Sequence, residues 1–127
     1  MRERNGEVNE RVRCVLVVED EIFIALELSD ALTDGGFRVL GPASSVTEAL
    51  DLLAGERPDA AVLDVNLGKE KVTPVALFLK SLGVPFIVAS ASNRAELAHI
   101  AVLSEVPNLG KPTDLTRLVD AVRALEG

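Results

Sequence analysis

The chain has 127 residues, 48% of them hydrophobic, which fits one globular domain with a sizeable core. It carries 20 acidic against 13 basic residues, and the formal charge of -7 disfavours nonspecific binding to nucleic acid or to an anionic membrane. This charge favours a cation or a basic protein surface as the partner.

The sequence contains neither a membrane span, which needs ~20 apolar residues, nor a signal peptide before residue 12. We expect residues 1–11 to be a flexible, charged tail, because they hold too little apolar surface to offset the entropy lost on ordering. Residues 12–127 should form the folded domain. Cys14 is the only cysteine, which excludes an intramolecular disulfide and predicts a reducing, cytoplasmic location.

The first strand is expected over residues 12–18, which are nearly all β-branched or apolar. Residues 21–34 then have helical spacing, and Gly35 and Gly36 supply the stop. The expected inner stripe of this helix is Ile22, Ala25, Leu26, Ser29 and Leu32. A second apolar stripe leaves two readings open, a deeply packed helix or one that presents part of a partner surface; it consists of Ile24, Leu28 and Ala31.

The second strand is expected over residues 37–40, followed by a helix capped by Ser44 or Ser45. The inner face of that helix should be Val46, Ala49, Leu50 and Leu53. Residues 60–63 predict a third strand buried on both faces. After a polar loop at residues 69–71 we expect a helix with Pro74 in its first turn. Its predicted inner stripe is Val75, Phe78, Leu79 and Leu82.

The fourth strand is expected over residues 86–90, and Asn93 should cap a helix over residues 94–103. A short, weak strand is expected near residues 106–109. Thr113 or Asp114 can cap the last helix, which has the clearest amphipathic pattern in the chain. Its apolar residues are Leu115, Leu118, Val119, Val122 and Leu125.

Strands and helices thus alternate in five successive (βα) units with short connections. This pattern predicts an α/β protein with a doubly wound, parallel five-stranded sheet and helices on both faces. The flavodoxin-like strand order 2-1-3-4-5 is the order we expect.

Reactive residues follow the expected strands at their carboxyl ends, the edge where open α/β sheets bind ligands. Glu19 and Asp20 follow the first strand and Asp64 follows the third. These strands are neighbours in the expected order, so the carboxylates should converge and repel one another. A divalent cation would relieve the repulsion, and Mg²⁺ suits hard oxygen ligands completed by water.

This set of groups is suited to phosphoryl transfer, because Ser90 follows the fourth strand and Lys111 follows the fifth. Asp64 would be the nucleophile and would form an acyl phosphate. The cation and Lys111 would offset charge on the phosphoryl oxygens, while Ser90 would donate a hydrogen bond to one of them. Since the Ser90 contact would exist only with phosphate present, it would also act as a switch.

The sequence resembles a response-regulator receiver domain of two-component signalling over about residues 12–126, on four segments in order: residues 15–20, 63–67, 85–91 and 111–112. The resemblance implies that Glu19 and Asp20 are the acidic metal-site pair and that Asp64 is the phosphoacceptor. It further implies that Asn66 is a metal ligand through its main-chain carbonyl. Ser90 would be the hydroxyl switch and Lys111 the invariable lysine, with a cis bond between Lys111 and Pro112.

Within the family, residues 64–68 and 83–86 look most like small stand-alone regulators typical of alphaproteobacteria. One group of these carries Phe-Ala-Thr-Gly-X-Tyr after the fourth strand, where this chain, at residues 88–93, lacks both aromatic residues. The switch aromatic of ordinary receivers should lie three residues before Lys111, and that position holds Asn108. We therefore expect the phosphorylation chemistry to persist with a different output mechanism.

The resemblance implies a single-domain response regulator that is not an enzyme and that receives phosphate from a histidine kinase or a histidine phosphotransfer protein. We expect it to signal by protein contact or phosphate relay, since residues 1–11 leave no room for an output domain. The family's usual contact face is the fourth helix, fifth strand and fifth helix. Apolar residues of that fourth helix also allow a homodimer; they are Ala95, Ala98, Ile100, Val102 and Leu103.

Two other functions share part of this residue pattern. A phosphatase with an aspartate nucleophile would also use Mg²⁺, but it needs a second aspartate two residues later, where Asn66 cannot transfer a proton. The other is a receiver-like binding module without phosphorylation-dependent switching; Asn108 favours it, whereas the acids with Ser90 and Lys111 oppose it. His99, the only histidine, builds no metal site by itself and is expected at the surface.

Overall fold

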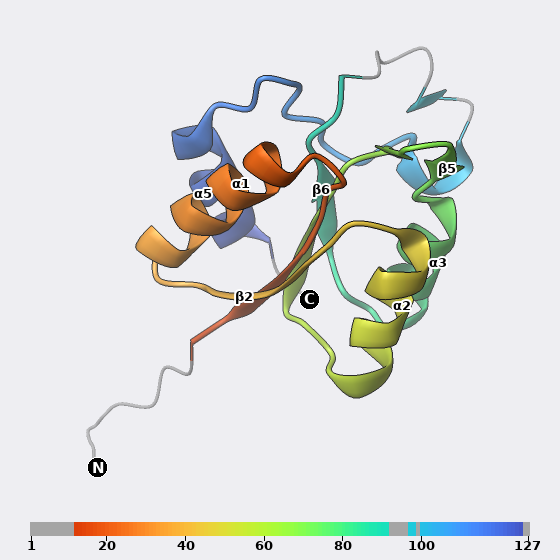
Figure 1. The fold of residues 1–127 in the computed structure, drawn as a ribbon, viewed down its shortest axis with the longest axis horizontal. Coiled ribbons are helices and arrows are strands. Elements are labelled where there is room, and N and C mark those ends of the chain that lie inside the picture. The colour runs from red at the N-terminus through yellow and green to blue at the C-terminus, as the bar shows by residue number, and fades with distance from the viewer. Residues whose placement is uncertain (1–11, 92–96, 99, 126–127) are drawn as a thin grey trace.

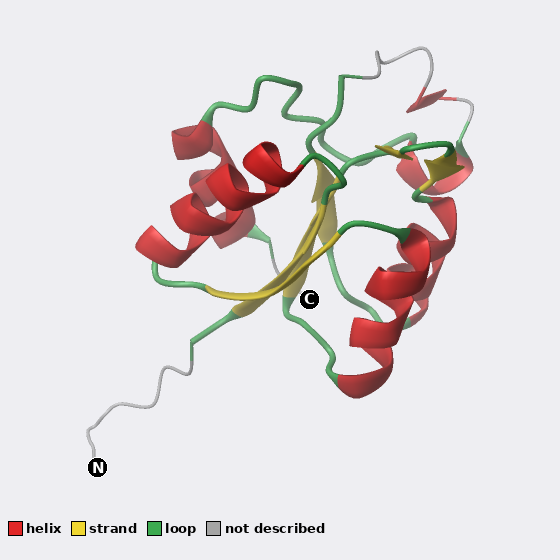
Figure 2. Ribbon diagram, in the orientation of Figure 1, coloured by secondary structure: helices red, strands yellow, loops and turns green. Residues whose placement is uncertain are grey.

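A computed structural model describes residues 12–91, 97–98 and 100–125. A parallel sheet lies between two layers of helices (Figures 1 and 2). Its strands are β1 (Cys14–Val18), β2 (Arg38–Ala43), β3 (Ala60–Leu63) and β6 (Phe86–Val88), in the order β2-β1-β3-β6. The helices are α1 (Ile22–Asp34), α2 (Val46–Gly55), α3 (Thr73–Ser81) and α5 (Leu115–Ala124), with the 3-10 helix η1 (Ala101–Leu103). None of these helices is long and apolar enough to cross a membrane.

The expected fold and strand order are confirmed, but the fifth strand is reduced to one bridge. Asn108 pairs in parallel with Val88. The Val88 N–H donates to the Pro107 carbonyl at 2.9 Å, and the Leu109 N–H donates to the Val88 carbonyl at 2.8 Å. Residues 106–109 therefore occupy the fifth position of the sheet, beside β6. The ladder does not extend further, because proline has no N–H to donate and an asparagine side chain competes for backbone groups.

Alternate residues of each strand face opposite cores, as the two-residue period of a strand requires. One core lies against α2 and α3 and includes Leu16, Val18 and Leu63. The other lies against α1 and α5 and includes Val15, Val17 and Val62. Figure 1 shows α1 and α5 on one face of the sheet and α2 and α3 on the other. Because both faces are covered, the strands consist almost entirely of buried apolar residues.

Local sequence signals set several element ends as predicted. Ser45 caps α2, and its Oγ accepts the Glu48 N–H at 3.1 Å. Asp114 caps α5, since its Oδ1 accepts the N–H groups of the next turn at 3.0 and 3.1 Å. Pro74 lies in the first turn of α3, and the Lys111–Pro112 bond is cis. The expected polar loop at residues 69–71 is instead part of a hairpin, formed by β4 (Asn66–Leu67) and β5 (Glu70–Lys71).

The prediction for the inner stripe of α1 is wrong in part. Ala25 and Leu32 are buried as expected, but Ile22 is 68% exposed and Leu26 is 49% exposed. The helix packs through a face centred on Leu28 and Leu32, so the second apolar stripe supplies much of the contact. Phe23 is 82% exposed beside Ile22 and Leu26. These three side chains form an exposed apolar surface, which we call the α1 patch.

Of the remaining expectations, some need correction and others concern residues that the structure does not describe. Phe78 of α3 is 38% exposed, because Ala76 instead joins Val75 and Leu79 in the core. Within the predicted helix over residues 94–103, residues 101–103 form the 3-10 helix η1. The predicted cap Asn93, the tail at residues 1–11 and His99 lie outside the described residues.

Two leucines of α1 provide a matched test of which face is buried. We expect Leu28→Ala to lower the free energy of unfolding by about 2–5 kcal/mol, because it leaves a cavity in the core. Leu26→Ala, on the exposed side, should change it by about 0.5 kcal/mol or less. Urea denaturation of both variants checks this, and equal losses would show that the helix packs through a different face.

Candidate functional site

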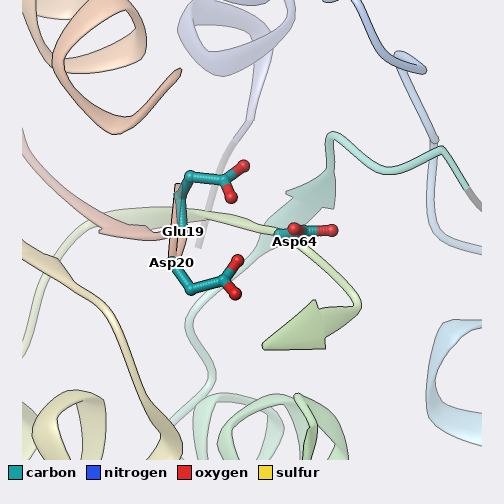
Figure 3. Close-up of side chains that lie close together, drawn as sticks. All are labelled: Glu19, Asp20 and Asp64. Atoms are coloured by element: carbon teal, nitrogen blue, oxygen red, sulfur yellow. The ribbon is translucent and has the colours of Figure 1, made fainter. Parts of the chain in front are cut away.

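Three carboxylates converge at the carboxyl ends of β1 and β3. The two strands pair in register, with Val18 opposite Leu63, and the Asp64 N–H donates to the Val18 carbonyl at 2.9 Å. Glu19 and Asp64, the residues that follow these strands, therefore emerge side by side. One oxygen each from Glu19, Asp20 and Asp64 lies within 4.8 Å of the others. Figure 3 shows the Glu19 and Asp20 carboxylates directed toward Asp64.

Lys111 brings a positive charge into this group. Its Nζ lies 3.0 Å from Asp64 Oδ2, 3.0 Å from Glu19 Oε1 and 3.2 Å from Glu21 Oε2. Burial alone would lower the pKa of Lys111, but the hydrogen bonds to Asp64 and Glu19 outweigh burial and raise the pKa above its ordinary value. The ammonium group is therefore charged at physiological pH and holds the ends of β1 and β3 together.

Glu19 is the most strongly perturbed acid of the site. Only 2% of the residue is exposed, and burial raises the pKa of its carboxyl to about 7, against the hydrogen bonds from the Glu21 N–H and from Lys111. The charged form is thus costly here despite the neighbouring lysine. With oxygen donors from Glu19, Asp20 and Asp64 around one ammonium group, the site retains an excess of negative charge. This donor set fits a hard divalent cation such as Mg²⁺.

Ser90 lies at the same edge of the sheet, one strand further along. It follows β6, and the Ala89 N–H before it donates to the Leu63 carbonyl at 2.9 Å, which ties this strand end to the residue preceding Asp64. Ser90 is 1% exposed. The structure thus brings the predicted residues Glu19, Asp20, Asp64 and Lys111 into direct proximity and places Ser90 on the adjacent strand end.

The Asn66 side chain contacts β5 of the hairpin. Its Oδ1 accepts a hydrogen bond from the Lys71 ammonium group, while its own N–H lies 3.5 Å from Asp64 Oδ1. The predicted contribution of Asn66 to a metal site involves its main-chain carbonyl and not this side chain.

The sequence-based analysis missed the contacts that three residues make in the site. Glu21 pairs with Lys111, and the Gly68 N–H donates to Asp20 Oδ2 at 2.9 Å. The third residue is Asn108, whose Oδ1 accepts the N–H groups of Ser90 and Gly110 at 3.1 and 2.9 Å. A signal for the Gly110 bond was present, because asparagine commonly accepts from the N–H two residues later in a turn. The Ser90 bond joins residues 18 apart and has no local signal.

Comparison with known proteins adds independent evidence. Residues 15–123 match the family described as the response regulator receiver domain. The transcriptional regulatory protein PdtaR of Mycobacterium tuberculosis is 28% identical over 112 residues, which cover 87% of this chain and 55% of that protein. The response regulator MprA of Mycolicibacterium vanbaalenii is 35% identical over 115 residues, which cover 87% of this chain and 49% of MprA. This chain spans about half the length of these two relatives.

Solved structures agree on the fold. A response regulator receiver protein from Pseudomonas putida superposes with a TM-score of 0.78 at 24% identity, covering 92% of this chain and 100% of that chain. A CheY-like receiver domain protein from Methanospirillum hungatei superposes with a TM-score of 0.79 at 19% identity, covering 89% and 92%. At these identities the likeness concerns the fold alone.

The family match and the fold agree with the acidic cluster, which is typical of the phosphoacceptor site of receivers. Receiver domains are components of two-component signalling and are not classic enzymes, in line with the expectation from the sequence. The chain belongs to the family of response regulator receiver domains.

Proposed function

We propose that this receiver domain accepts a phosphoryl group on Asp64, with Mg²⁺, from a phosphohistidine of a kinase or a phosphotransfer protein. The observation that carries the proposal is the position of Lys111, whose Nζ lies 3.0 Å from Asp64 Oδ2 within the carboxylate cluster. A lysine in contact with the nucleophile is well placed to stabilise the charge of an incoming phosphoryl group.

In the proposed reaction an Asp64 carboxylate oxygen attacks phosphorus. The bond from phosphorus to the donor imidazole nitrogen breaks, and its electron pair stays on that nitrogen. Lys111 would donate to a phosphoryl oxygen, and the Ser90 hydroxyl would donate to another. Glu19, Asp20, Asp64 and the Asn66 main-chain carbonyl would hold Mg²⁺, which supplies positive charge for the phosphoryl oxygens when bound.

We further propose that the phosphohistidine donor docks on the α1 patch. Ile22 and Phe23 begin α1 directly after Glu21, whose carboxylate contacts Lys111 at 3.2 Å, so the patch adjoins the site. Exposed aromatic and aliphatic side chains next to a reactive group are suited to binding a protein that must bring its histidine there. The family's usual output face includes residues outside the described part of the chain, so a homodimer or target contact there remains a prediction.

The second candidate is a receiver-like binding module that works without phosphorylation. Asn108, in place of the switch aromatic, is the observation that favours it. This reading requires that the acids and Lys111 serve only to stabilise the fold. Phosphate uptake by the folded wild type distinguishes the two functions.

The phosphoacceptor is tested by intact mass after incubation with phosphoramidate and Mg²⁺. We expect the wild type to gain the mass of one phosphoryl group and Asp64→Asn to gain none, because an amide is too weak a nucleophile. Asp51→Asn, which alters an exposed acid on α2, is the matched control and should react as the wild type does. A folded wild type that takes up no phosphate would favour the binding module.

The metal site is tested by titrating Mg²⁺ into the wild type and Asp20→Asn. We expect the affinity to fall by about 10-fold or more, since even outer-shell partners of a metal site contribute that much. An asparagine retains an oxygen for the Gly68 N–H, so the local fold should persist. Calorimetry or the Mg²⁺-dependent rise in Tm reports the affinity. Equal affinities in the two proteins would remove Asp20 from the site.

The α1 patch is tested with Phe23→Glu. Transfer from a phosphorylated histidine phosphotransfer domain should slow by about 10-fold or more, because an interface anchor is replaced by a charge. Transfer from phosphoramidate, which needs no docking surface, should be unchanged. Leu77→Glu places the same charge on α3, at a residue that is 55% exposed, and serves as the control. Equal slowing by both variants would argue against docking on α1.

A further inference from the structure

One side-chain oxygen joins the two loops that carry Ser90 and Lys111. Asn108 bridges to Val88 at the end of β6. Its Oδ1 accepts the Ser90 N–H at 3.1 Å and the Gly110 N–H at 2.9 Å. The residue after Gly110 is Lys111. Asn108 thus binds the backbone of one candidate phosphoryl-contacting residue and the backbone adjacent to the other.

Both hydrogen bonds of Asn108 hold backbone whose position determines the position of a nearby side chain, that of Ser90 or that of Lys111. Ser90 is 1% exposed, so its hydroxyl is confined by the position of its own backbone. Gly110 has a φ of +79°, a conformation that favours glycine, and this turn directs the chain into Lys111. The Lys111 Nζ then reaches Asp64 Oδ2 and Glu19 Oε1 at 3.0 Å each. Because Gly110 directly precedes Lys111, a shift of the backbone at Gly110 would also shift Lys111.

In this chain the Asn108 side chain supplies an acceptor to both N–H groups. An apolar or aromatic side chain offers no oxygen to either N–H, and leaving a partly buried N–H without a partner is unfavourable. The adjacent residues form hydrogen bonds that involve the backbone alone. The Ala89 N–H donates to the Leu63 carbonyl, and the Leu109 N–H donates to the Val88 carbonyl. Only the Ser90 and Gly110 bonds of this group depend on the Asn108 side chain.

We propose that Asn108 is a positioning residue that holds Ser90 and Lys111 in register around Asp64. It acts through the backbone of Ser90 and Gly110, and it deepens the proposed function, on which it rests. Phosphoryl transfer to Asp64 then depends on Asn108, because Ser90 and Lys111 are the groups proposed to contact the phosphoryl oxygens. Small displacements of groups that contact a reacting centre have large effects on rate.

The test compares Asn108→Leu, which removes the oxygen at similar size, with Asn108→Asp, which retains it. At saturating Mg²⁺ we expect the leucine variant to take phosphate from phosphoramidate about 10- to 100-fold more slowly than the wild type. The aspartate variant should recover most of the rate. The use of saturating Mg²⁺ for each protein keeps any difference in Mg²⁺ affinity out of the comparison of rates. Should the leucine variant fold poorly, Asn108→Ala removes the same oxygen without added bulk.

Amide hydrogen exchange of the full chain tests the two bonds without any phosphorylation. In Asn108→Leu, the Ser90 and Gly110 amides should lose protection by about 10-fold or more, while the neighbouring Ala89 and Leu109 amides keep theirs. In Asn108→Asp all four should remain protected.

Three results would overturn the proposal, and they differ from one another. Unchanged protection of Ser90 and Gly110 in Asn108→Leu would show that the bonds do not hold these loops. Lost protection with an unchanged rate would make Asn108 a purely structural residue. A wild type that takes up no phosphate would overturn the proposed function and this proposal with it, while exchange would still report whether the bonds exist.

Discussion

The contact of the Lys111 ammonium group with Glu19 and Asp64 is the interaction on which the site depends. Carboxylates whose oxygens lie within 4.8 Å of one another repel, and Glu19 is also almost fully buried. Without a positive charge between them, the ends of β1 and β3 would be forced apart, and the pKa of Glu19, already raised by burial, would rise further. Lys111 provides that charge, and its raised pKa shows that the acids stabilise it in return. The ion pairs therefore reduce the repulsion between the carboxylates, so that β1 and β3 can pack side by side up to the site.

This arrangement requires distant segments to meet at one edge of the sheet. In a parallel sheet every strand ends at the same edge, so the residues after β1, β3 and β6 are brought together by topology alone. Lys111 has no complete strand to place it, because residues 106–109 make only a single bridge to β6. Its position relies on that bridge, on the two backbone bonds around Val88 and on the Asn108 side chain. A side chain thus supports the part of the site that lacks a regular strand.

The fold and the convergence of acids could be predicted from the sequence, whereas the surface and the loops could not. Runs such as residues 60–63 are too apolar for an exposed strand, and strand order then places Glu19 next to Asp64. The packing face of α1 was misjudged, because two adjacent apolar stripes share the helical period and only the position of α5 and the sheet selects between them. The Ser90 bond of Asn108 joins residues 18 apart, and local sequence pattern carries no information on such a contact.

Asn108 changes how such a site can be connected to the rest of the molecule. An aromatic side chain at a switch position can alternate between rotamers without breaking a hydrogen bond, because it has few polar groups to satisfy. Asn108 instead accepts from two N–H groups, so moving it leaves both of them to find new partners, at a cost per group of about 1–3 kcal/mol when buried. Movement of Ser90 toward a phosphoryl group would accordingly be transmitted to Gly110 and Lys111 through a shared oxygen. The coupled movement would then involve Ser90, Gly110 and Lys111, which lie at the site. The exposed side chains of Ile22 and Phe23 follow Glu21, which contacts Lys111.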